Sequence, residues 1–117
     1  MRRLVAATVA IWMLHLECVH AAALLSQRQA RNKAIDILKG DPYGRTRVAA
    51  EKNIKSVRFA RNGNTKACGP VKTAVWEFHI VVMRPDKNQF ASEIIDGFLA
   101  LDARTGKIRC ANLPSLD

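Results

Sequence analysis

Apolar and polar residues alternate with a period of two over three stretches of this chain. Residues 54–61 alternate charged with apolar side chains and end at the turn-forming Asn62-Gly63-Asn64. The strongest alternation covers residues 73–83, and residues 94–101 have the same character. We expect three strands, and we expect a helix to pack on one face of the second strand, the face that carries Trp76, Phe78, Ile80 and Val82.

A helical pattern precedes these strands. Ser26 and Gln29 have the spacing of a capping box, with Leu25 at the preceding apolar position. The following apolar residues recur on one helical face: Ala30, Ala34, Ile37 and Leu38. Residues 40–42, Gly-Asp-Pro, end this helix. Residues 43–53 are less regular, and whether residues 48–52 add a helical turn stays open.

The segment 97–110, GFLALDARTGKIRC, is typical of a hairpin. A strand rises to Asp102, bends over residues 103–106 and returns through residues 107–110. Gly106 permits a positive φ, and Asp102 and Thr105 can bond the amides of the turn itself. We therefore assign Asp102, Thr105 and Gly106 to a hairpin turn. Residues 84–88, with Pro85, are expected to form a loop.

Together these elements predict an α+β fold in which an N-terminal helix packs on a three- to four-stranded antiparallel sheet. Residues 1–23 are typical of a secretory signal peptide, with two arginines, an apolar stretch and small residues before the cleavage site. Cleavage after Ala23, or alternatively after Ala21, leaves one small domain, residues 24–117. The expected destination is the bacterial periplasm or the medium.

Removing the signal peptide changes the charge and cysteine content. Two of the 19 basic and one of the 10 acidic residues leave with it, so the net charge of the remainder is about +8. Cys18 also leaves, and Cys68 with Cys110 is expected to form a disulfide in an oxidising compartment. In a plain meander these cysteines would lie at opposite ends of the sheet. Either residues 62–71 fold back along the sheet, or the last strand lies elsewhere.

Catalytic and metal chemistry find little support in the sequence. No CxxC is present, and the cysteine spacing matches no metal site, so we expect no metal or cofactor. His79 is the only histidine after residue 23, and it shares a strand face with Glu77 because the two are two residues apart. We interpret both as exposed surface residues. Asp96 is explained by the entrance of a strand and Asp102 by the turn, so we expect no enzyme.

Basic side chains gather along the first predicted strand and its approach. Those that we assign to a binding surface are Lys52, Lys55, Arg58 and Arg61, and Lys66 and Lys72 extend the set. A structural role, in which charge protects a sheet edge from aggregation, is an equal alternative. Nucleic-acid binding is not expected, because Phe59 is the only aromatic residue among these charges and its position favours the core.

One helix, a strand containing VWEFHIVV and then IIDGFLALDARTGKI together resemble the PepSY-type module of exported bacterial proteins. The matching positions are Trp76, Gly97, Asp102, Thr105 and Gly106. The resemblance implies a cystatin-like fold and a binding or inhibitory role toward extracytoplasmic proteases and envelope partners. Residues 41–53 and the two cysteines depart from that pattern, so the fold transfers more safely than the partner.

The sequence thus predicts an exported, noncatalytic binding protein, an inhibitor or immunity-type partner of another envelope or secreted protein that is acidic. The alternative is a basic adaptor that binds anionic envelope material, either cell wall or lipid head groups, through the basic strand. The identity of the partner and the oligomeric state stay open.

Overall fold

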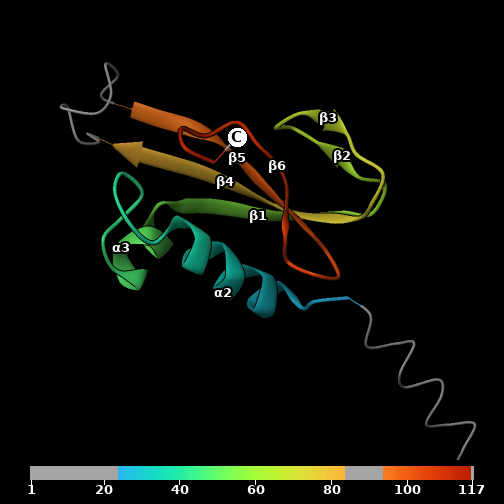
Figure 1. The fold of residues 1–117 in the computed structure, drawn as a ribbon, viewed down its shortest axis with the longest axis horizontal. Helices are drawn as coiled ribbons and strands as arrows, with labels where there is room; N and C mark the ends of the chain where they lie inside the picture. Colours follow the sequence, from blue (N-terminus) through green and yellow to red (C-terminus); the bar gives the residue numbers. More distant parts are fainter. Residues whose placement is uncertain (1–23, 84–93, 117) are drawn as a thin grey trace, which may run out of the picture.

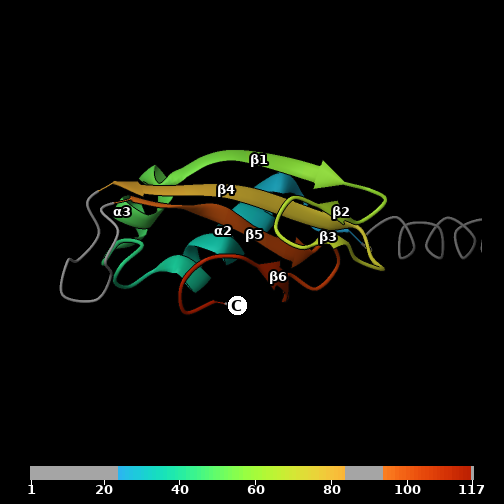
Figure 2. The same cartoon turned by 90° about the horizontal axis from the view of Figure 1, so that it is seen from above.

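The fold has two layers, a helix and a four-stranded sheet. A computed structural model describes residues 24–83 and 94–116 (Figure 1). The sheet is antiparallel, and its strand order is β1-β4-β5-β6, formed by Ile54–Ala60, Val75–Met83, Ile94–Asp102 and Ile108–Ala111. Helix α2, Gln27–Leu38, lies across one face of this sheet (Figures 1 and 2). The predicted α+β class is confirmed. The predicted signal peptide, with Cys18, and the loop 84–88 lie outside the described residues.

Helix α2 begins with the predicted capping box. The Ser26 hydroxyl accepts a hydrogen bond from the Gln29 backbone N–H at 3.1 Å, and Gln29 Oε1 accepts from the Ser26 N–H at 2.8 Å. The face that α2 buries is made of Ala30, Ala34, Ile35 and Leu38. The two alanines bring the helix close to the sheet. Ile37, which the pattern placed on this face, is only partly buried.

The core lies between α2 and the sheet because the period-two pattern turns alternate side chains of β4 and β5 toward the helix. Phe78, Ile80 and Leu99 are fully buried there. Trp76 packs against this core, and its indole N–H donates to the Leu25 carbonyl at 3.1 Å. The predicted helix-facing set of β4 therefore meets the helix as expected.

Residues 40–53 contribute Tyr43 and Ala50 to the core, although their sequence pattern is weak. Thr46 caps a second helix, α3, Arg47–Lys52, which settles the open helical turn in favour of a helix. Tyr43 is 3% exposed, and its hydroxyl donates to the Pro114 carbonyl. Asn53 donates through Nδ2 to the Tyr43 carbonyl at 2.7 Å. The segment thus joins the helical layer to the C-terminal residues.

A small hairpin lies over the other face of the sheet. Its strands are β2, Asn64–Thr65, and β3, Gly69–Pro70 (Figures 1 and 2). A disulfide joins Cys68 of this hairpin to Cys110 of β6, with their Cα atoms 6.3 Å apart. The predicted pairing is confirmed, and of the two geometric solutions the chain takes the first: the segment after β1 folds back along the sheet.

The turn between β5 and β6 follows the expected chemistry. Asp102 Oδ1 accepts from the backbone N–H groups of Arg104 and Thr105 at 2.8 and 3.1 Å, and Gly106 has a φ of 75°. The Thr105 hydroxyl accepts from the Lys107 N–H at 3.2 Å.

Among the helices of the described part of the chain, none has the length and apolar character required to cross a bilayer.

Candidate binding face of the sheet

The sheet face opposite α2 carries the polar residues Ser56, Arg58, Glu77 and His79. Cross-strand register places Arg58 of β1 opposite Glu77 of β4, and Ser56 opposite His79. His79 in turn pairs with Phe98 of β5. The β2–β3 hairpin covers the part of this face around Glu77 and Cys110. The part around His79 is half-buried or exposed.

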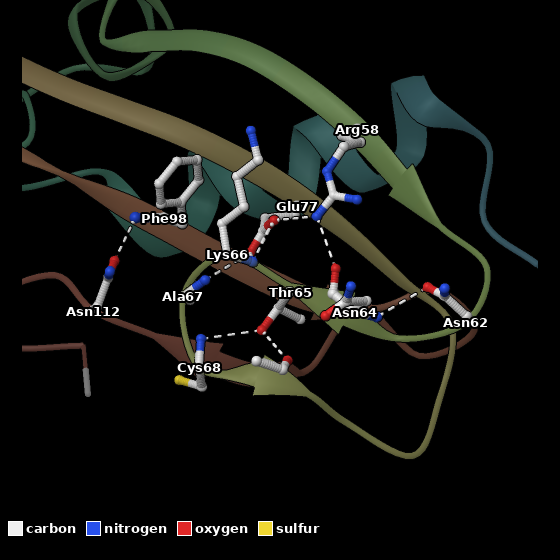
Figure 3. A network of polar contacts seen from close by, with 11 residues as sticks. Arg58, Asn62, Asn64, Thr65, Lys66, Ala67, Cys68, Glu77, Phe98 and Asn112 are labelled. Carbon is white, nitrogen blue, oxygen red and sulfur yellow. Dashed lines mark hydrogen bonds and ion pairs between the residues drawn. The ribbon is translucent and has the colours of Figure 1, made fainter.

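Glu77 is the buried centre that fastens the hairpin to the sheet. Its residue exposure is 2%. The carboxylate accepts from the Arg58 guanidinium at 2.6 Å, from the Lys66 backbone N–H at 2.8 and 3.0 Å, and from the Ala67 N–H at 3.1 Å (Figure 3). The prediction that Glu77 is an exposed surface residue is wrong. The returning hairpin buries it, and charged and backbone donors compensate for the lost hydration.

An aromatic pair occupies the neighbouring part of the face. The His79 and Phe98 rings stack with centroids 4.7 Å apart and an interplanar angle of 18°. His79 Nε2 lies 2.7 Å from Asp96 Oδ1. On the other ring of the pair, the Lys66 ammonium lies 5.7 Å from the Phe98 ring centroid, and Figure 3 shows these two side chains. We call Ser56, Lys66, His79, Asp96 and Phe98 the His79 patch.

The backbone under the patch is also held in place. The Phe98 N–H donates to Asn112 Oδ1 at 2.6 Å (Figure 3). Asn112 and Leu113 lie so close to the β5 backbone that a Cβ at Gly97 would come within 2.8 Å of both residues. Glycine at position 97 therefore allows the residues after β6 to fix the strand that carries Phe98.

Ser56, His79 and Asp96 form a row of the three residue types used in nucleophilic hydrolysis. Their arrangement differs from a catalytic triad, because Asp96 is 60% exposed in its side chain and no hydrogen bond joins Ser56 to His79 in the described structure. A nucleophile requires a base within hydrogen-bond reach and a third group that orients the base. The row provides the orienting contact but not the first hydrogen bond.

The four residues of the predicted basic strand do not gather at one place. Lys52 ends α3, and the Lys55 ammonium donates to the Lys52 carbonyl at 3.3 Å near the start of β1. Arg58 is engaged by Glu77, and Arg61 follows the other end of β1. Their shared binding role stays a prediction.

Within residues 24–83 and 94–116, no group of three His, Cys, Asp or Glu side chains has metal-binding geometry.

Comparison with protein-family models, with curated proteins and with solved structures found no match for this chain. The resemblance to PepSY-type modules therefore rests on the residues alone.

Sequence reasoning missed Phe98 as a residue of the candidate site. Its signal was available only in part: the strand pattern puts Phe98 and His79 on one side of their strands, but the register that stacks them arises from the hairpin and the sheet together.

Proposed function

We propose that this chain is an exported, noncatalytic binding protein that uses the His79 patch to engage another envelope or secreted protein. The observation that carries the proposal is the stacked His79–Phe98 pair, which Asp96 and Lys66 hold on an open sheet face. Aromatic residues fixed before binding lose little entropy on association, and they dominate the energetics of many interfaces.

The disulfide supports both the rigidity and the location of this surface. Cys68 and Cys110 tie the hairpin that carries Lys66 to β6, and Glu77 anchors the same hairpin from below. A disulfide fits an oxidising compartment. Together with the signal-peptide pattern and the PepSY-type resemblance, it supports a periplasmic or secreted bacterial protein of inhibitory or immunity type.

The charge pattern supports an acidic partner. Lys66 borders the aromatic pair, and the chain as a whole is strongly basic. A complementary surface presents an apolar or aromatic side chain with carboxylates around it. Such charges accelerate association and select the partner more than they add affinity.

The experiment uses protein produced from the full sequence and purified in its oxidised form. Binding partners are captured from envelope extract at low and high salt, and a captured protein is then purified and titrated against the variants. We expect Phe98→Ala to weaken the purified complex at least tenfold, which corresponds to about 1.4 kcal/mol. The matched surface variant Lys39→Ala, on the helical layer, should bind normally.

Two results would change the proposal. Retention of cell-wall or lipid material alone, abolished by high salt, would favour the basic adaptor, because screening removes exposed charge interactions. Hydrolytic activity that is lost in both Ser56→Ala and His79→Ala would show that the row on this face is catalytic, and the noncatalytic proposal would then fail.

A further inference from the structure

A cavity of about 600 Å³ lies at the end of the sheet where β1 ends, β4 begins and β5 turns into β6. This is the end that the N-terminal segment crosses, with the Leu25 N–H donating to the Ala103 carbonyl at 2.7 Å. Its polar lining consists of Arg61, Lys72, Thr73, Asp102, Arg104, Thr105 and Arg109. None of these belongs to the His79 patch, and the cavity is a separate feature of the fold.

Positive charge prevails in this lining. Arg109 pairs with Asp102 at 3.1 Å, whereas Arg61, Lys72 and Arg104 form no ion pair with any residue in the described ranges. Four cations thus face a single carboxylate. A concave surface lined by one sign of charge concentrates its field and attracts counter-ions.

The carboxylate itself is already satisfied. Asp102 accepts from two backbone N–H groups through Oδ1 and from the Arg109 guanidinium through Oδ2. Burial raises the pKa of this carboxyl, but hydrogen bonds from Arg104, Thr105 and Arg109 outweigh that effect and lower the pKa from 3.8 to about 2. Asp102 therefore stays ionised and engaged, and it leaves the other cations uncompensated.

The Thr73 hydroxyl is an unsatisfied hydrogen-bonding group beside the cavity. Its oxygen is buried and has no hydrogen-bond partner within the described structure. An unpaired buried hydroxyl is unfavourable, and buried polar groups in proteins are nearly always satisfied. Since Thr73 lines the cavity, rotation about its Cα–Cβ bond turns the hydroxyl toward a ligand oxygen, which then supplies the missing partner.

The cavity also has an apolar wall, formed by Leu24, Phe59 and Ala74. Its volume lies in the range of sites for small organic ligands, and it exceeds what a bare oxyanion fills. Guanidinium forks match the geometry of phosphate oxygens, and several converging cations suit a group that carries more than one negative charge.

We propose that this cavity binds a phosphate group that carries a short apolar substituent. The phosphate lies against Arg61, Lys72 and Arg104 and accepts from the Thr73 hydroxyl, and the substituent packs on Phe59. The site rests on residues outside the His79 patch, so it goes beyond the proposed protein interface and stands or falls independently of it.

The test is a titration of the oxidised protein with hexyl phosphate, inorganic phosphate and hexanol, followed by amide chemical shifts and calorimetry. We expect hexyl phosphate to saturate with shifts at Thr73, Ala74 and Arg104, and to bind at least tenfold more tightly than inorganic phosphate. Hexanol should not bind measurably.

Two variants and a control locate the site. The double variant Arg61→Gln/Lys72→Gln should weaken hexyl phosphate at least tenfold, whereas Lys39→Gln/Arg45→Gln, which removes the same charge from exposed positions, should not. Thr73→Val should weaken binding about fivefold without lowering the thermal midpoint, because it removes an unpaired hydroxyl at nearly constant volume. A loss of binding together with a loss of stability would instead show a structural role for Thr73.

Vesicles distinguish the two sources of such a group. Binding to phosphatidylglycerol vesicles but not to phosphatidylcholine vesicles, with displacement by hexyl phosphate, assigns the site to a lipid head group. Hexyl phosphate binding without vesicle binding assigns it to a soluble phosphate ester. The proposal is overturned if hexyl phosphate does not saturate in the millimolar range, or if the Arg61/Lys72 double variant binds it like the wild type.

Discussion

At the scale of single residues, three carboxylates show how burial changes the role of one chemical group. Glu77 and Asp102 are buried and accept several hydrogen bonds each, whereas Glu51 forms an exposed ion pair with Arg31. The turn role of Asp102 follows from local sequence, because the backbone N–H groups that donate to its carboxylate lie two and three residues away. The role of Glu77 does not, because its backbone donors are ten and eleven residues away on a hairpin.

Substitution of Glu77 tests this difference. In Glu77→Gln an amide group faces the N–H donors and the Arg58 guanidinium, so we expect a loss of about 2 to 4 kcal/mol in the free energy of unfolding. Glu51→Gln is the matched control, and its loss should stay below about 0.5 kcal/mol because the pair is exposed. Urea unfolding measures both. Equal losses in the two variants would refute the anchoring role of Glu77.

Asp102 predicts a specific acid dependence. Its pKa is about 2 in the folded protein against an ordinary value of 3.8, so its ionised form stabilises the fold above the unfolded pKa. That stabilisation, on the order of 2 kcal/mol, is lost as pH falls through about 2. We expect Asp102→Asn to flatten the decline of unfolding free energy between about pH 5 and pH 2. The exposed Asp41→Asn serves as the control. An unchanged slope in Asp102→Asn would contradict the assignment.

At the scale of elements, local periodicity predicted most of the secondary structure, and tertiary contacts decided the rest. Residues 73–83 were expected as one strand and form β4 from Val75 to Met83. The hairpin 64–70 has strands of only two residues each, too short for a periodic signal, and its position depends on Cys110 and Glu77. Tyr43 likewise depends on a residue far away in sequence, because its hydroxyl donates to the Pro114 carbonyl.

The hairpin gives the prediction at this scale. Cys68→Ala/Cys110→Ala opens a loop that spans 42 residues, and the chain-entropy estimate is a loss of about 3 to 4 kcal/mol in unfolding free energy. The backbone amides of Lys66 and Ala67 donate hydrogen bonds to the Glu77 carboxylate. They should exchange with solvent faster in the variant than in the oxidised wild type. Wild type after reduction is the control and should match the variant. Unchanged exchange at these amides would show that Glu77 alone holds the hairpin.

At the scale of the whole molecule, the two sheet faces have different tasks. One packs on α2 and forms the core, and the other carries the β2–β3 hairpin (Figure 2). The disulfide ties this hairpin to β6 beside the His79 patch. The sequence indicated a basic strand as the binding surface. The length of β1, seven residues, separates Lys55 near its start from Arg61 just after its end, so the two side chains do not form one surface. Binding surfaces form across strands, so a single strand's pattern cannot define them.

The central claim is that the partner contacts the His79 patch, and site-specific photo-crosslinking tests it most directly. A benzophenone amino acid replaces Ser56 in the patch or, as the control, the exposed Asn32 on α2. The account predicts one discrete protein adduct at position 56, retained at high salt, lost in Phe98→Ala and absent at position 32. Equal adducts at both positions, or an adduct at position 56 that Phe98→Ala leaves unchanged, would contradict it.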